Sequence, residues 1–190
     1  MKILVLDNYD SFTYNLVYML RELGFGEKIN VIRNDKIHLE EVSGYDKILI
    51  SPGPGLPKSA GILKALIRNY CHSKSILGIC LGHQGIAEVF GARLYNMPVV
   101  RHGEPGEMQV IVNSEILFRG LPASFTACHY HSWAVDPDTV NSELQVTAVD
   151  EKKCIMGLSH VSYDVRGLQF HPESVLTKVG MKIIENWIKH

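Results

Sequence analysis

The sequence predicts an α/β fold, with a central, mostly parallel sheet flanked by helices and a strand-rich second half. Two observations predict this class. Short aliphatic runs alternate with helical patterns as far as about residue 91, and shorter strand-like runs separated by turns follow. With 190 residues, of which 46% are hydrophobic, the chain can bury one sizeable core, so we expect a single domain over residues 1–190.

The expected parallel strands are four runs rich in β-branched and aliphatic residues: Lys2–Leu6, Lys28–Ile32, Lys47–Ser51 and Ser75–Ile79. The first strand precedes a predicted helix over Ser11–Leu23, where apolar residues recur at helical spacing. Ser11 is the expected N-cap of this helix, and Gly24 lies just past its end. Further helical segments are expected at His38–Val42, Ala60–Tyr70 and Gln84–Phe90.

The second half is predicted to contain short strands at Gln109–Val112, Phe125–Cys128, Leu144–Val149, Ile155–Ser159 and Val165–Phe170. Its last segment, Val179–Lys189, has an apolar face that includes Ile183, Ile184 and Trp187. This pattern predicts a closing helix packed on the sheet.

Charge and cysteine content exclude several classes of function. The 19 basic and 20 acidic residues give a formal charge of −1 without long runs of either sign, so neither nucleic acid nor a membrane is an expected partner. The four cysteines lie far apart without a Cys-x-x-Cys pair, which argues against a zinc site and gives no disulfide framework. No apolar run is long enough to span a membrane. We expect a cytoplasmic protein without metal or cofactor, although a plastid protein that has lost its transit peptide would have the same features.

A candidate nucleophile, Cys80, lies between the fourth expected strand and the helix after it, in the motif GICLGHQ at residues 78–84. The flanking glycines permit the sharp strand-to-helix turn that exposes a nucleophile, and the helix N-terminus favours thiolate over thiol. A cysteine at the end of an apolar strand is more often a small buried hydrophobic residue. Here the glycines, strand and helix together favour acyl transfer through a thioester.

The expected base and its orienting carboxylate are His171 and Glu173, in the motif GLQFHPE at residues 167–173. In an extended segment residues i and i+2 point to the same side, and Pro172 fixes the intervening φ. Glu173 could therefore accept a hydrogen bond from one imidazole nitrogen while the other faces Cys80. On its own the motif is better explained as a polar loop after a strand, but with Cys80 it predicts a nucleophile, a base and an orienting acid.

Two further motifs bear on ligand binding. The loop SPGPG at residues 51–55 follows the third strand, so the N–H groups of Gly53 and Leu81 could form an oxyanion hole, although an ordinary turn explains the loop as well. The motif HYHSW at residues 129–133 places two histidines two residues apart without a third ligand of suitable spacing. We therefore do not expect a metal there.

Five motifs together resemble the class I glutamine amidotransferases: DNYDSFTYNL at 7–16, SPGPG at 51–55, GICLGHQ at 78–84, HYHSW at 129–133 and GLQFHPES at 167–174. The resemblance extends from end to end and implies the flavodoxin-like architecture of that family. The opening motif is similar to the branch that forms the small subunit, component II, of anthranilate synthase and aminodeoxychorismate (para-aminobenzoate) synthase.

The resemblance implies a site and a chemistry. Cys80 would be the nucleophile, His171 the general base and acid, and Glu173 the carboxylate that orients the histidine. The residues implied to bind glutamine, with Leu81 at the oxyanion hole, are Gly53, Pro54, Gly55, Leu81, Gln84, Ser132 and Trp133. Hydrolysis of L-glutamine to glutamate would release ammonia to a separate chorismate-using synthase subunit, for anthranilate (tryptophan) or 4-amino-4-deoxychorismate (folate) synthesis.

Three positions differ from the family pattern. Residues 104–106, Glu-Pro-Gly, replace a segment that commonly begins with lysine, His129 stands where arginine is common, and Trp133 stands where leucine is common. These differences predict altered partner contact or coupling with an intact triad. Two alternative functions remain, a stand-alone γ-glutamyl hydrolase and a non-catalytic regulatory subunit, of which the intact triad disfavours the second. The sequence does not distinguish the two pathways.

Overall fold

Five parallel strands form one half of a nine-stranded sheet, whose strand order is β2-β1-β3-β4-β9-β8-β7-β5-β6. The computed structural model describes residues 1–190. The parallel strands are β1 (Ile3–Asp7), β2 (Ile29–Arg33), β3 (Lys47–Ile50), β4 (Ser75–Ile79) and β9 (Val165–Leu168). The order 2-1-3-4 is that of flavodoxin-like folds, in which ligands bind beyond the carboxyl ends of the strands.

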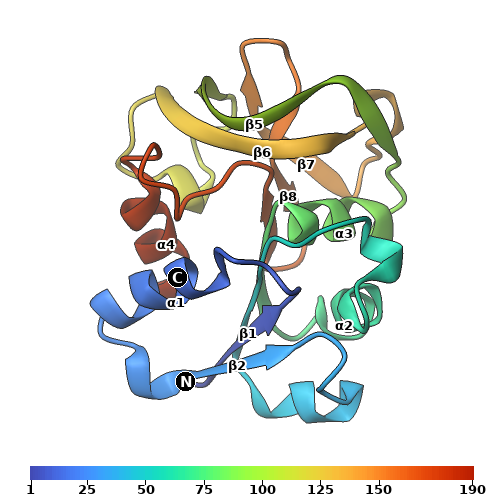
Figure 1. Ribbon diagram of the computed structural model, residues 1–190, viewed down its shortest axis with the longest axis vertical. Coiled ribbons are helices and arrows are strands. Elements are labelled where there is room, and N and C mark those ends of the chain that lie inside the picture. The colour runs from blue at the N-terminus through green and yellow to red at the C-terminus, as the bar shows by residue number, and fades with distance from the viewer.

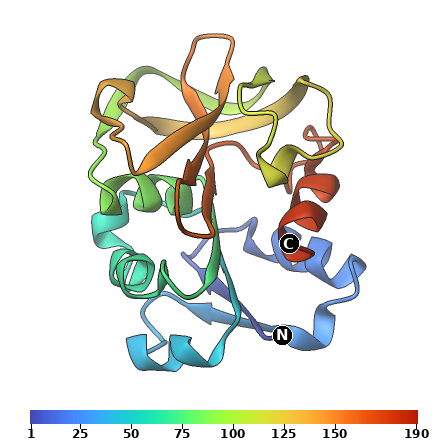
Figure 2. The ribbon, with the colours of Figure 1, turned by 180° about the vertical axis from the view of Figure 1, so that it is seen from behind.

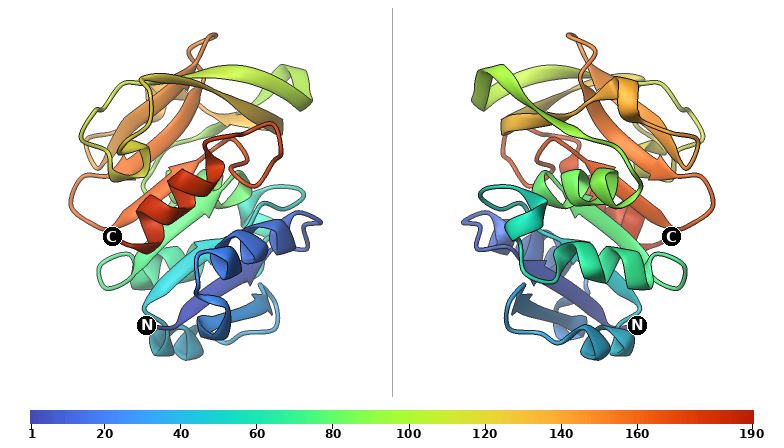
Figure 3. Two further views of the ribbon diagram at one scale, coloured as in Figure 1. Left: turned by 90° about the vertical axis from the view of Figure 1, so that its left-hand side faces the viewer. Right: turned by 90° about the vertical axis from the view of Figure 1, so that its right-hand side faces the viewer.

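Helices cover both faces of this parallel half. Helices α1 (Thr13–Glu22) and α4 (Gly180–Ile188) lie on one face, and α2 (Leu63–Tyr70) and α3 (Leu81–Val89) lie on the other (Figure 1; Figure 3). Alternate strand residues therefore enter two cores: Ile3 and Val5 pack in the core with α1 and α4, whereas Leu4 and Leu6 pack in the core with α2 and α3. Burial on both faces explains why these strands are nearly continuous hydrophobic runs.

Four antiparallel strands continue the same sheet: β5 (Leu94–Val110), β6 (Ser124–Val135), β7 (Leu144–Asp150) and β8 (Ile155–His160). Strands β5 and β6 cross the top of the molecule, at the end where β4 gives way to α3 (Figure 1; Figure 2). The main-chain N–H of His171 donates to the carbonyl of Cys128 at 3.2 Å, so the segment after β9 is joined directly to β6.

The first four predicted strands agree with the structure to within one residue at each end, and the closing helix is present as α4. Three expected helix starts were wrong. Helix α2, expected from Ala60, begins at Leu63. Helix α1 begins at Thr13 with Phe12 in the N-cap position and no side-chain cap, so Ser11 is not the N-cap. The preceding loop is organised instead by Asp7, whose Oδ1 accepts hydrogen bonds from Tyr9 N at 3.0 Å and Thr13 Oγ1 at 2.8 Å. Helix α3 begins at Leu81, three residues before its expected start.

The second half departs further from expectation, because β5 starts at Leu94 rather than at Gln109 and β6 continues through Val135. Register shifts interrupt the pairing of β5 with β6 after Asn96 and after His102, so no regular alternation marks this strand in the sequence. The helical segment expected at His38–Val42 is a 3₁₀ helix, Leu39–Gly44. The other 3₁₀ helices are Gly26–Lys28, Pro57–Ser59, Ile116–Phe118 and Pro137–Thr139. None of the helices combines the length and apolar character that a membrane crossing requires.

Candidate active site

Cys80 lies at a strained turn between β4 and α3. Its φ is 50° and its ψ is −97°, a conformation that non-glycine residues rarely adopt and that concentrates at functional sites. The turn is tight because Gly78 lies against the main chain of α3; a Cβ on Gly78 would come within 2.6 Å of the Gly82 carbonyl oxygen. The Cys80 N–H donates to the carbonyl of Leu168 at 2.7 Å, which fixes the turn to β9. The thiol is 7% exposed and precedes the unpaired N–H groups of the first turn of α3.

His171 and Glu173 are buried together just beyond β9, the strand next to β4. The Nδ1 of His171 and the Oε1 of Glu173 are 2.6 Å apart, and the two residues are 2% and 9% exposed. The aromatic rings of Phe12 and Tyr130 pack against the imidazole, with centroids at 6.1 Å and 5.0 Å. The ring is therefore held in one orientation by a carboxylate on one side and by aromatic contacts around it.

The surroundings of His171 favour a positive charge on its ring. Burial opposes that charge, but the Cys80 sulfur and the Glu173 carboxylate outweigh burial and raise the pKa of His171 to about 10. The Nε2 atom makes no hydrogen bond of good geometry, although the sulfur is near enough to contribute to the raised pKa. The arrangement suits an imidazolium beside a thiolate.

The loop after β3 approaches the start of α3. A Cβ built on Gly53 would lie 2.5 Å from Cβ of Asn8 and 2.8 Å from Cδ2 of Leu81, so only glycine allows this approach. Asn8 holds the loop in place, since its main-chain N–H donates to Ser51 Oγ at 2.9 Å and its side-chain Nδ2 donates to the Ser51 carbonyl at 2.8 Å. The structure thus brings the loop of residues 51–55 and Leu81 together.

A small cleft opens beside Cys80. Its volume is about 180 Å³, below the roughly 300–1,000 Å³ of clefts that hold drug-sized ligands, which suits a small substrate. Its lining comes from the loop after β3, from the β4–α3 turn with the start of α3, and from β6: Gly53, Pro54, Gly55, Cys80, Gln84, Tyr130, His131, Ser132 and Trp133. No lysine, arginine or carboxylate lines it, so a neutral or zwitterionic ligand would be bound largely by main-chain and amide groups.

The cleft contains six of the seven residues expected to bind substrate, and Leu81, the seventh, is buried beside Gly53. Sequence reasoning missed Tyr130 and His131, because it treated the motif at residues 129–133 mainly as a possible metal site. It also missed Gln169, whose Nε2 lies 3.6 Å from the Cys80 sulfur. The alternation that placed Glu173 beside His171 applies equally to Gln169, two residues before the histidine.

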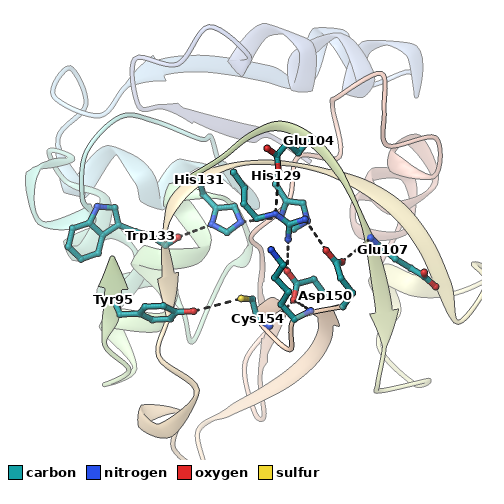
Figure 4. A network of polar contacts seen from close by, with 11 residues as sticks. Tyr95, Glu104, Glu107, His129, His131, Trp133, Asp150 and Cys154 are labelled. Carbon is teal, nitrogen blue, oxygen red and sulfur yellow. Dashed lines mark hydrogen bonds and ion pairs between the residues drawn. The ribbon is translucent and has the colours of Figure 1, made fainter. Parts of the chain in front are cut away.

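His129 and His131 contact each other rather than a common ligand. The Nδ1 of His129 lies 3.1 Å from the Nε2 of His131, and the Nδ1 of His131 lies 3.0 Å from the carbonyl oxygen of Trp133 (Figure 4). His129, Asp150 and Glu151 form a cluster of possible metal ligands, with their ligand atoms within 4.8 Å of one another. The guanidinium of Arg101 is paired with both carboxylates of this cluster, at 2.7 Å and 3.0 Å, so a protein cation already occupies this place.

Acyl transfer through a thioester requires a reactive sulfur, a proton-transfer group beside it and donors for the developing oxyanion. An α/β fold with a cysteine at the sharp turn between a strand and a helix defines a cysteine-dependent enzyme of that class. Comparison with known proteins specifies the family. The model of class-I glutamine amidotransferases matches residues 4–190. The chain belongs to the class-I glutamine amidotransferase family, and it is an enzyme of that kind.

Relatives at similar length support the assignment. The chain is 45% identical over 194 residues to anthranilate synthase component 2 of Thermus thermophilus, covering 100% of this chain and 92% of the relative. It is 42% identical over 188 residues to aminodeoxychorismate synthase component 2 of Escherichia coli, covering 98% of each. A solved structure from Thermoplasma acidophilum, provisionally named as one of the subunits of GMP synthase, matches with a TM-score of 0.87 at 29% identity and covers 100% of this chain and 92% of its own.

Proposed function

We propose that this chain hydrolyses L-glutamine at Cys80 and delivers the ammonia to a separate synthase subunit that uses chorismate. The observation that carries the proposal is the strained, buried Cys80 next to a His171–Glu173 pair separated by 2.6 Å. Two relatives are named component 2 of anthranilate synthase and of aminodeoxychorismate synthase, and a second component implies a first. The product made by the assembly would be anthranilate or 4-amino-4-deoxychorismate, according to the partner.

The proposed reaction begins when the Cys80 thiolate attacks the side-chain amide carbon of glutamine. The oxyanion that forms would be stabilised by the N–H groups of Gly53 and Leu81. The imidazolium of His171, held by Glu173, protonates the amide nitrogen, so the C–N bond breaks, ammonia leaves and a γ-glutamyl thioester remains. The same imidazole then removes a proton from water, which attacks the thioester, releases glutamate and restores the thiolate beside the imidazolium.

The proposed binding site for glutamine is the cleft beside Cys80. The main chain of residues 53–55 and of Ser132 and Trp133 would contact the substrate from opposite walls, and Gln84 would contact it from α3. His131 is neutral at physiological pH, because burial lowers its pKa to about 4. The cleft would therefore bind zwitterionic glutamine without a net charge of its own.

The proposed partner explains exposed apolar residues close to the site. Val175 and Leu176, directly after the segment of Glu173, are 92% and 40% exposed and line an open cleft of about 360 Å³ with Pro105 of β5. Ammonia released into water would be protonated and diluted, so a partner docked on this face would keep it reactive. We place the assembly in the cytoplasm, where a reducing environment suits four free cysteines.

The proposal is tested by Cys80→Ser in the chain combined with the synthase that copurifies with it. We expect this variant to lose glutamine-dependent product formation while ammonia-dependent product formation stays unchanged. Cys71 is also buried, and the control variant Cys71→Ser should form product from both nitrogen sources. Loss of the ammonia-dependent reaction would contradict the proposed role of Cys80. Rapid glutaminase turnover by the isolated chain that no synthase alters would favour a stand-alone γ-glutamyl hydrolase. The identity of the copurifying synthase assigns the pathway.

A further inference from the structure

Gln169 contacts the proposed nucleophile but has no part in the mechanism above. Its side chain is fully buried, and its Nε2 donates to the Cys80 sulfur at 3.6 Å. Its Oε1 accepts a hydrogen bond from the Nε2 of Gln84 at 3.2 Å. The Nε2 of Gln84 also donates to the carbonyl oxygen of Trp133 at 3.0 Å. Two side-chain amides thus connect a wall of the cleft to the sulfur.

The carbonyl of Trp133 determines the direction of these amides. A carbonyl oxygen only accepts, so Gln84 must present its NH₂ group to Trp133. The second hydrogen of that NH₂ group points to Gln169, so the side-chain oxygen of Gln169 must accept it. The NH₂ group of Gln169 is then left for Cys80, and the sulfur receives a donor rather than a repelling oxygen.

The same carbonyl determines the tautomers of the two histidines on its other side. His131 must carry a proton on Nδ1 in order to donate to Trp133, and because the ring is neutral its Nε2 must accept. His129 must therefore donate from Nδ1, which leaves its Nε2 without a proton. The Nε2 of His129 is buried and makes no hydrogen bond, so no acceptor facing it calls for a proton on that atom.

Arg101 lies beside the Nε2 atom of His129: a Cβ built on Gly106 would collide with that Nε2 and would lie 3.0 Å from Nη2 of Arg101. It is 5% exposed and held by ion pairs with Asp150 and Glu151. Burial, and then the positive charge of Arg101, lower the pKa of His129 to about 3. A cation at this place opposes a proton on Nε2, so both ends of the network impose the same direction.

We propose that Gln169 donates a hydrogen bond to the Cys80 thiolate, and that the Trp133 carbonyl fixes the direction of its amide through Gln84. On its other side the same carbonyl fixes the tautomers of His131 and His129, which complete this directional network. This proposal rests on the proposed function and deepens it. Gln169 touches the reacting sulfur, whereas Gln84 is a positioning residue. The network joins β6 to the proposed nucleophile that follows β4.

The first test measures the alkylation rate of Cys80 by iodoacetamide at about pH 5, with the labelled peptide identified by mass. Gln169→Met has a similar shape but no donor, and losing a hydrogen bond to a charged group depopulates the thiolate roughly tenfold. Higher intrinsic nucleophilicity offsets part of this loss, so the rate should fall about threefold. The alkylation rate of Gln169→Glu should fall further, because a carboxylate repels the thiolate. Gln145 is exposed, and the control variant Gln145→Met should be alkylated at the wild-type rate. Wild-type rates in both folded Gln169 variants would overturn the proposal.

The second test reads the tautomers of the unmodified chain from nitrogen-15 to proton two-bond correlations. His129 and His131 should both carry their proton on Nδ1 and remain neutral from about pH 5 to 8, with Arg101, Asp150, Glu151 and His171 as the charged groups near them. His129→Leu removes the donor to the Nε2 of His131 but should leave the His131 proton on Nδ1, because the Trp133 carbonyl still accepts from that atom. A proton on Nε2 of either wild-type ring would overturn this directional network.

These measurements separate the inference from the proposed function. Alkylation and tautomer spectra require no glutamine hydrolysis, so they report on Gln169 and the histidines even if the chain turns out to act on another amide. Conversely, an unperturbed alkylation rate in Gln169→Met together with normal glutaminase activity would remove the inference and leave the proposed function in place.

Discussion

At the scale of single residues, Cys80 and His171 each have properties that a purely structural role would not favour. The positive φ of Cys80 costs roughly 1–3 kcal/mol, which only a strongly determined environment maintains. His171 and Glu173 are buried ionisable groups that are stable as a charged pair only because they contact each other and the sulfur. The strained turn at Cys80 therefore lowers the stability of the fold, whereas the His171–Glu173 pair holds the proposed acid beside the sulfur.

The first residue-scale prediction concerns Glu173. Glu173→Gln keeps the shape of the side chain but removes the charge that orients and stabilises the imidazolium of His171. We expect kcat for glutamine to fall roughly 10²-fold or more, as for other losses of acid–base function, with KM changed less than about twofold. Glu173 does not line the cleft, which is why binding should be preserved.

Initial rates of glutamate release, measured with the synthase present, give both constants for this comparison. Glu185→Gln on the exposed side of α4 is a matched control and should behave as the wild type. A kcat within threefold of the wild type for Glu173→Gln would exclude the orienting role.

The second residue-scale prediction concerns stability and pH. The pKa of His171 is raised to about 10, against about 6.5 in an unfolded chain, so the native state binds this proton more tightly. The stability that His171 contributes is therefore complete below about pH 6.5 and is lost as pH rises through about 10. In urea unfolding, the free energy of unfolding of the wild type should exceed that of His171→Gln at pH 7, and this difference should shrink as the pH rises to 10. A gap between the two proteins that widens with rising pH would contradict the raised pKa.

At the scale of elements, the junction of β4 with α3 determines where the nucleophile lies. The strand and the helix approach closely because Gly78 carries no side chain, and Gly82 lets α3 approach Ile50 of β3 in the same way. Strand β9 then lies beside β4 with His171 just beyond its end. The geometry of the candidate site is thus a consequence of strand order and of two glycines rather than of a flexible loop.

A prediction about this junction follows from the contacts of Gly78. Gly78→Ala would place a Cβ 2.8 Å from the His83 main-chain nitrogen and against the carbonyl of Gly82, and the helix backbone cannot yield as a side chain would. We expect the free energy of unfolding to fall by about 2 kcal/mol or more. Gly44→Ala, which would meet nothing within 4 Å, should change it by less than about 0.5 kcal/mol. Equal urea midpoints for the two variants would mean that the junction is looser than its contacts imply.

How far the sequence predicts each element depends on how local its signal is. Strands β1, β3 and β4 are buried on both faces, so their hydrophobic runs mark them directly. Strand β5 carries no such mark, because residues such as Val99 and Val100 are 63% and 58% exposed and register shifts break its alternation. The location of Arg101 beside Asp150 and Glu151 depends on this strand, so the sequence could not reveal that contact.

At the scale of the whole molecule, the candidate site is assembled from both halves of the sheet. The parallel half supplies Cys80 and the loop of residues 51–55, and β6 of the antiparallel half supplies the opposite wall. Sequence motifs identify the first group from local turn chemistry. The hydrogen bonds of Gln84 with Trp133 and Gln169 join residues 49 and 85 positions apart, and only the fold brings them together.

The exposed face beside the site leads to a prediction about assembly. Glu104 is 58% exposed and lies 3.8 Å from the Nε of Arg101, a distant pairing that contributes little to stability. Glu104→Lys should therefore leave the urea midpoint almost unchanged. If the synthase docks on this face and offers a basic residue to Glu104, the reversed charge should weaken association about tenfold, mainly through electrostatic repulsion that high salt reduces.

Calorimetric titration of the copurifying synthase with each variant at two salt concentrations measures this effect. Glu27→Lys reverses an equally exposed charge at the amino ends of the parallel strands, away from the proposed docking face, and should bind as the wild type does. Because the two variants carry the same net charge, a difference between them locates the interface rather than reporting a general change in charge. Unchanged affinity for Glu104→Lys would remove Glu104 from the interface while leaving the chemistry at Cys80 untouched, since β5 contributes no residue to the lining of that cleft.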